Sequence, residues 1–127
     1  MCSFTVEKET DVMAERKKLR EVCEMLGISR RTVQGYEKKG IVKPSGKNKY
    51  GYLLYDKSEI EKIAFAQFLQ SMGFSLDEIA HIMRADNSEK ARIIGLQIEV
   101  MKQKIDNLNS VLEKSLSIRE KLSNKEK

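Results

Sequence analysis

The C-terminal part of the chain has the pattern of one long helix with a continuous apolar seam. From about Glu89 to Leu122 the sequence contains no proline and one glycine, Gly95. Apolar residues recur there alternately at every fourth and third position, at Ile94, Ile98, Met101, Ile105, Leu108 and Leu112. This heptad spacing is typical of a coiled coil, and it weakens where Ser115 and Arg119 take the next two positions.

A helix of this kind predicts a second copy of the chain. At about 1.5 Å per residue it would extend to roughly 50 Å, which is too far for one small domain to cover its apolar seam. We therefore predict a homodimer joined through this helix. The alternative is a helix that folds back onto its own domain.

Two short helices joined by a tight turn are expected earlier in the chain. The apolar face of the first consists of Leu19, Val22, Cys23 and Leu26. Gly27 can adopt the positive φ that ends this helix. A second helix is expected from Arg30, capped by Ser29, to about Lys39, just before Gly40. The pair has the helix-turn-helix pattern, whose second helix enters the major groove of DNA, although other helical hairpins share the pattern.

A small basic wing is expected next, over residues 41–55. Turn-forming residues occur throughout its first part, at Pro44, Gly46, Asn48 and Gly51. The residues that favour a strand are Tyr50, Tyr52, Leu53, Leu54 and Tyr55. Because Lys43, Lys47 and Lys49 surround the turn, we predict two strands with a basic tip.

Two further helices should complete the domain. The first starts at Asp56 or Ser58, each followed three positions later by a glutamate that can form a capping box, and ends at Gly73. Its buried residues are predicted to be Ile60, Ile63, Ala64, Phe68 and Met72. The second follows Ser75, with Glu78 as the capping partner. Its inner face is predicted to consist of Leu76, Ile79, Ala80 and Met83.

The expected protein is therefore mainly α-helical. It would have a flexible leader over residues 1–17, a winged helix-turn-helix DNA-binding domain over residues 18–84 and a coiled-coil dimerisation helix over residues 85–127. Apolar residues make up 40% of the chain and charged residues 34%, which suits a globular protein with long solvated helical faces.

The positive charge is concentrated in the N-terminal half. The net charge is +5; residues 1–57 hold 13 basic and 8 acidic residues, whereas residues 58–127 hold 11 of each. Between Ile28 and Lys57, 8 basic residues face 2 acidic ones. Such a patch indicates a polyanionic partner, DNA or RNA. The alternative is a solvated surface without a partner.

Several other classes of function find no support in the sequence. No apolar run approaches the ~20 residues of a membrane span, and residues 1–15 lack the pattern of a secretory signal, so we expect a cytoplasmic protein. The cysteines, Cys2 and Cys23, and the single histidine, His81, do not have metal-ligand spacing. No catalytic set and no phosphate-binding glycine loop is present. We therefore expect no enzyme, no metal site and no cofactor.

Three segments in order resemble the MerR family of bacterial transcription regulators. Residues 19–44 (LREVCEMLGISRRTVQGYEKKGIVKP) are similar to its N-terminus, and residues 50–55 (YGYLLY) and 72–79 (MGFSLDEI) to its next two signatures. The resemblance implies a dimer held by an antiparallel coiled coil, with a recognition helix in the major groove and a wing on the flanking backbone. It also implies regulation of a promoter whose spacer DNA is bent and untwisted, with RNA polymerase as a further partner.

The resemblance and the charge pattern together give a set of expected DNA contacts. Arg30, Arg31 and Thr32 open the recognition helix, where side chains meet phosphates and base edges. Tyr36 either contacts the backbone or packs under the wing, and Tyr55 is as well suited to the core as to DNA. The remaining expected contacts are Gln34, Lys38, Lys39, Lys43, Lys47, Lys49 and Tyr52.

The chain departs from the family pattern at three positions on the expected DNA-binding face. Gln34 and Gly35 stand where the family usually has Arg-Tyr, and Leu53 stands where it usually has arginine. Glycine also costs about 1 kcal/mol of helix stability relative to alanine. We expect an altered operator, or weaker binding with a sharper salt dependence. Gln34 can instead read adenine through a bidentate contact.

The inducing signal is not specified by the sequence. Metal-sensing members of the family use cysteines at both ends of the dimer helix, but residues 84–127 contain no cysteine and no histidine. The chain up to Lys127 is also expected to lack the large ligand-binding domain of other members. A small ligand, a protein partner or the thiols remain as possible sources of a signal. Two other functions stay open: a DNA-bending accessory factor similar to an excisionase, and a coiled-coil protein-interaction factor.

Overall fold

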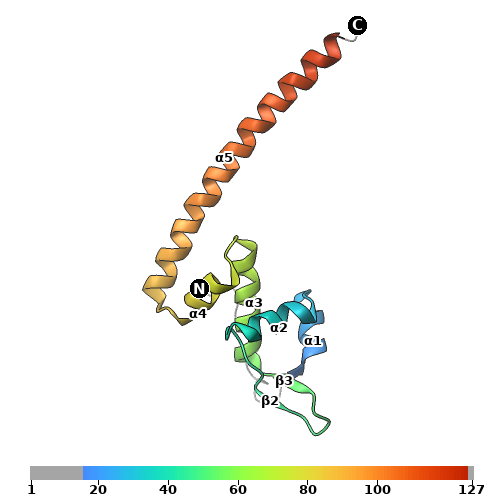
Figure 1. The fold of residues 1–127 in the computed structure, drawn as a ribbon, viewed down its shortest axis with the longest axis vertical. Helices are drawn as coiled ribbons and strands as arrows, with labels where there is room; N and C mark the ends of the chain where they lie inside the picture. The colour runs from blue at the N-terminus through green and yellow to red at the C-terminus, as the bar shows by residue number, and fades with distance from the viewer. Residues whose placement is uncertain (1–15, 126–127) are drawn as a thin grey trace. The chain divides into compact units, whose positions relative to one another are not determined.

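The computed structural model describes residues 16–125, which form a mainly helical protein with a small sheet (Figure 1). The predicted fold class is confirmed. In chain order the elements are β1 (Lys17–Lys18), α1 (Leu19–Leu26), α2 (Arg30–Lys38), β2 (Gly46–Lys47), β3 (Leu53–Tyr55), α3 (Lys57–Ser71), α4 (Leu76–Arg84) and α5 (Asn87–Lys125). Two compact units result, the first ending at Ala85 and the second beginning at Asp86. The leader predicted over residues 1–17 lies outside the described residues except for its last two.

Capping residues set the ends of the helices in the first unit. Gly27 has φ of 65° directly after α1. The Ser29 Oγ accepts the Thr32 backbone N–H at 3.1 Å and so begins α2. Ser75 and Glu78 form the predicted reciprocal box at the start of α4, with N···O distances of 3.2 and 2.8 Å. These bonds satisfy backbone groups that the first turn of a helix leaves unpaired, and the predicted positions of the three helices are confirmed.

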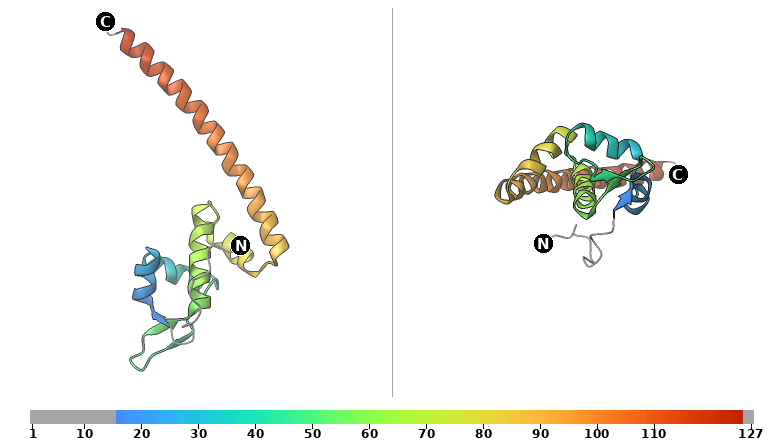
Figure 2. Two further views of the ribbon diagram at one scale, coloured as in Figure 1. Left: turned by 180° about the vertical axis from the view of Figure 1, so that it is seen from behind. Right: turned by 90° about the horizontal axis from the view of Figure 1, so that it is seen from below.

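The buried faces of α3 and α4 differ in part from those predicted. On α3, Ala66 and Leu69 are buried, whereas Phe68 is exposed and Ala64 only half-buried. In Figures 1 and 2, α1 and α4 lie on opposite sides of α3. A helix covered on two sides needs apolar residues around most of its circumference, so a single stripe did not identify its inner face. On α4, Ile82 is buried and Met83 half-buried.

The sheet has three antiparallel strands in the order β1-β3-β2. Lys47 pairs with Leu53 and forms the predicted wing hairpin. Lys18 of β1 pairs with Leu54 on the other edge of β3, and this third strand was not predicted. Tyr50, which was expected in a strand, instead lies in the turn at the wing tip.

One core joins the four helices of the first unit to the base of the wing. Its most buried large side chains, each less than 2% exposed, are Tyr36, Tyr55, Ile63, Leu69, Ile79, Ile82, Val22 and Val33. They come from α1, α2, β3, α3 and α4, so the recognition helix and the wing are fixed to the same core.

The second unit is a single helix, α5. It begins at Asn87, two residues before the start that the sequence pattern predicted. The Asp86 Oδ1 accepts the Glu89 backbone N–H at 2.9 Å at this end of the helix. No side chain of α5 is buried in the part of the chain that the structure describes. Within residues 16–125, no helix is both long enough and apolar enough to cross a membrane.

Candidate nucleic-acid interface

Helix α2 presents a basic face to solvent and an apolar face to the core. Val33 and Tyr36 are buried, and Thr32 is half-buried. The side chains exposed on the opposite face are Arg30, Arg31, Gln34, Lys38 and Lys39. These are the predicted contact residues of a recognition helix, brought to one surface by the 3.6-residue period.

Helix α3 holds the helix-turn-helix in place through two hydrogen bonds. The Tyr36 hydroxyl donates to the Gln70 Oε1 at 2.8 Å. The Gln67 side-chain amide donates to the Leu26 carbonyl at 2.9 Å, at the end of α1. Tyr36 is only 1% exposed, and burial raises the pKa of its phenol. Tyr36 was expected to contact DNA or to pack inside; because its ring fills the core, it is removed from the contact set.

Thr32 and Lys39 also have partners within the domain. The Thr32 and Ser29 hydroxyls lie 2.9 Å apart and stabilise the first turn of α2. The Lys39 Nζ lies 2.8 Å from the Asp77 Oδ1 at the start of α4. Both groups of this ion pair are largely exposed, so it adds little stability and leaves Lys39 accessible.

The wing tip is organised by Asn48. Its side-chain Oδ1 accepts the backbone N–H groups of Tyr50 at 2.9 Å and Tyr52 at 3.1 Å, and Gly51 supplies φ of 84°. Lysines at positions 43, 47 and 49 are exposed around this turn. The ammonium groups of Lys49 and Lys18 each lie 5.3 Å from a tyrosine ring, of Tyr50 and Tyr52 respectively. The wing therefore offers both positive charge and exposed aromatic rings.

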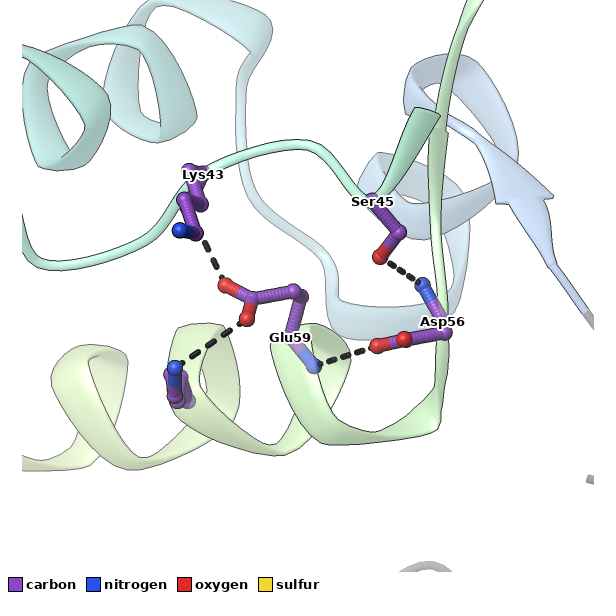
Figure 3. A network of polar contacts seen from close by, with 5 residues as sticks. Lys43, Ser45, Asp56 and Glu59 are labelled. Carbon is purple, nitrogen blue, oxygen red and sulfur yellow. Dashed lines mark hydrogen bonds and ion pairs between the residues drawn. The ribbon is translucent and has the colours of Figure 1, made fainter. Parts of the chain in front are cut away.

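A buried carboxylate fixes the base of the wing (Figure 3). Glu59 is 8% exposed, and its two oxygens bind the Lys43 backbone N–H and the Lys62 Nζ, each at 3.0 Å. The sequence predicted a capping box between Asp56 and Glu59. Only half of it forms, because the Asp56 backbone N–H donates to the Ser45 Oγ at 2.9 Å instead.

Tyr55 joins the wing to the recognition helix from the inside. Its ring is fully buried, and its hydroxyl donates to the Glu37 carboxylate on α2. Burial raises the pKa of Tyr55 well above its ordinary value, and the hydrogen bond to Glu37 adds to the effect. Of the two roles that the sequence allowed for Tyr55, the structure supports the core.

A cleft of about 440 Å³ opens between α2 and the wing. Its lining includes Arg30 and Gln34 from the recognition helix and Tyr52 and Leu53 from the wing. Lys18 and Arg20 also line it. These two residues were not predicted to have a role, although they belong to a visible cluster of basic residues at positions 16, 17, 18 and 20.

The remaining candidate groups do not gather into a reactive site. Cys23 is half-buried, and burial raises the pKa of its thiol while the nearby Arg30 lowers it. Within residues 16–125, no three His, Cys, Asp or Glu side chains lie close enough to hold a metal ion. His81 is exposed.

The expected dimerisation residues lie along α5. Ile98, Ile105, Leu108 and Leu112 are exposed, with exposed fractions of 57% for Ile105 and 68% for Leu108. Ile94 and Met101 are half-buried. An uncovered apolar seam of this length on a single chain is the surface that a partner helix would bury.

A basic helix anchored on a core, beside a basic wing, defines a winged helix-turn-helix DNA-binding domain. The family model of the MerR helix-turn-helix regulatory proteins matches residues 18–86. The chain belongs to the MerR family and is a DNA-binding transcription regulator.

Relatives of known sequence or structure agree with this assignment. A Haemophilus influenzae protein named "Probable heavy metal-dependent transcriptional regulator" is 28% identical over 100 residues, covering 74% of this chain and 78% of its own. The Bacillus subtilis transcriptional activator mta is 28% identical over 101 residues, covering 77% of this chain but only 39% of its own.

Two solved structures share the fold. The N-terminal part of the same B. subtilis activator superposes with a TM-score of 0.63 at 27% identity, over 78% of this chain and 96% of that one. HiNmlR, a MerR family regulator lacking the sensor domain and bound to promoter DNA, gives a TM-score of 0.67 at 23% identity, over 78% of this chain and 80% of that one.

Proposed function

We propose that this regulator binds an inverted-repeat operator as a homodimer and controls transcription by bending or untwisting promoter DNA. The observation that carries the proposal is the exposed basic face of α2, whose opposite face is fixed in the core by Val33 and Tyr36. A rigid helix with exposed arginines at its N-terminal end is suited to the major groove, where arginine binds guanine edges and phosphates.

The proposed contact set keeps every predicted residue except the buried Tyr36. Arg30 and Arg31 would meet phosphates and base edges at the start of α2, Gln34 would face a base edge, and the lysines would neutralise phosphates. Thr32 would add a backbone contact near the start of α2. The residues proposed to contact the flanking DNA are five lysines and one tyrosine: Lys38, Lys39, Lys43, Lys47, Lys49 and Tyr52.

The exposed seam of α5 supports the homodimer. A single copy leaves Ile105 and Leu108 more than half exposed, and burying a leucine side chain contributes about 1.5–3 kcal/mol. Two copies related by a twofold axis would bury equivalent seams and carry two recognition helices to two half-sites. HiNmlR, which shares this fold, is bound to promoter DNA in its structure, and this supports promoter DNA as the target.

The site of action would be the cytoplasm, with RNA polymerase as a further partner at the promoter and no catalytic step. The heavy-metal dependence named for the H. influenzae relative is not carried over. Residues 84–127 contain no cysteine or histidine with which the dimer helix could bind such a metal.

The test is selection of bound sites from random duplex DNA, with sequencing, at two salt concentrations. We expect enrichment of an inverted repeat and steep loss of binding as the salt concentration rises. A selected site that lies outside promoters would support a DNA-bending accessory factor instead. Absence of enrichment would contradict operator binding and favour a role in protein interaction through α5.

A further inference from the structure

We propose that the cleft between α2 and the wing holds one DNA backbone phosphate per half-site, bound by Lys18 and Arg20 together with Arg30. The inference rests on the proposed DNA-binding function and adds to it the N-terminal strand β1 and the start of α1. Neither of these elements belongs to the contact set described above.

Strand β1 is held at a fixed place beside the wing. Lys17 pairs with Tyr55 and Lys18 with Leu54 on the edge of β3. The Lys18 backbone N–H donates to the Glu21 Oε1 at 2.8 Å, which begins α1. Main-chain bonds position Lys18, and its side chain is therefore available to bind an anion. Its ammonium lies over the exposed ring of Tyr52, 5.3 Å from the centroid.

The cleft is positively charged. Among the residues that the structure describes, its lining includes three cations, Lys18, Arg20 and Arg30, and no acidic side chain. Within residues 16–125, the only ion pair of Arg20 is to Glu24, at 3.8 Å between two largely exposed groups. Such an exposed ion pair contributes little stability, so a phosphate can compete with Glu24 for the Arg20 guanidinium.

The cleft lies between the two elements that would face DNA, α2 and the wing. A sugar–phosphate strand separates the major groove from the neighbouring minor groove. If α2 enters the major groove and the wing follows the flanking backbone, that strand must pass between them. The cleft lies there, with Leu19 and Leu53 giving an apolar surface for a deoxyribose beside the cations.

The test measures how the operator dissociation constant depends on salt for single neutral variants. Arg20→Gln and Lys18→Gln each remove one cation from the phosphate site of both half-sites, so each should lower the slope of log Kd against log salt by up to about 1.8 for the dimer. At about 0.1 M salt each should weaken binding by up to roughly 60-fold. The matched control is Arg84→Gln, an exposed arginine on α4 outside the cleft, which should leave the slope unchanged.

Two further measurements separate a phosphate contact from damage to the fold. Arg20→Lys keeps the charge and should restore the slope to that of the unaltered protein. Ethylation of one phosphate in each half-site should weaken binding of the unaltered protein but no longer affect binding of Arg20→Gln.

The outcomes distinguish this inference from the proposed function. If the unaltered protein binds its operator but Arg20→Gln and Lys18→Gln behave like Arg84→Gln, the cleft does not hold a phosphate and the operator model stands. If the unaltered protein does not bind duplex DNA, both proposals are overturned.

Discussion

Glu59 joins α3 to the base of the wing, because its carboxylate accepts the Lys43 backbone N–H and also binds the Lys62 ammonium on the same helix. Glu59→Ala should lower the free energy of unfolding by about 1–3 kcal/mol, because it leaves a part-buried N–H without its acceptor. Glu59→Gln keeps an amide oxygen in place and should cost less. Urea unfolding measures both. Lys62→Ala is the control, since it removes only the exposed partner; equal losses for Glu59→Ala and Lys62→Ala would contradict this role.

Gly35 lies inside α2 with an ordinary negative φ. A Cβ added there would meet the Leu76 Cδ1 at 3.8 Å, which is normal van der Waals contact. Gly35→Ala should therefore raise the free energy of unfolding by up to about 1 kcal/mol. Thermal unfolding followed by circular dichroism measures the gain, and a lower melting temperature would show that the position needs glycine. Operator affinity, measured in parallel, shows whether a methyl group obstructs DNA.

At the level of single residues, the sequence predicted the basic side chains of the surface, but not which residues lie beside one another in the α2–wing cleft. Gln34 and Leu53 stand where the family resemblance leads one to expect arginine, and both line the α2–wing cleft. Lys18 and Arg20 line the same cleft. No local pattern could place them there, because only the pairing of β1 with β3 brings residues this far apart together.

The wing depends on a side chain at its tip. Asn48→Ala removes the acceptor for the Tyr50 and Tyr52 N–H groups and should cost about 1 kcal/mol of stability, since both bonds are exposed. Amide hydrogen exchange at both residues should quicken severalfold, whereas exchange of the buried Val33 should change little. Asn48→Asp keeps an acceptor and is the matched control. Unchanged exchange in Asn48→Ala would mean that the hairpin is held by its strands alone.

Helix ends were predicted well because they depend on local chemistry. A serine cap or a glycine with positive φ acts within one turn, so Ser29, Gly27 and Ser75 identified the helix ends directly. The β1 strand was missed because two lysines carry no apolar signal and are held only by main-chain bonds to β3. The inner face of α3 was partly wrong because long-range packing selects Leu69 over Phe68.

At the scale of the whole molecule, the seam of α5 should determine the oligomeric state. Leu108→Glu introduces a charge into both copies of the seam and should weaken the dimer roughly 100-fold or more. Ser110→Glu adds the same charge on nearly the opposite face of the helix, because two residues turn it by about 200°. It should leave the dimer intact. Sedimentation equilibrium distinguishes the two, and a dimer unaffected by Leu108→Glu would place the interface elsewhere.

The most direct test of the account is the affinity and stoichiometry of the protein on its selected operator compared with a single half-site. We predict two chains per duplex on the whole repeat, bound at least about 100-fold more tightly than the half-site, because the joined second subunit binds at high effective concentration. Leu108→Glu should abolish this difference. One chain per duplex, with equal affinity for the whole site and the half-site, would contradict a dimeric regulator.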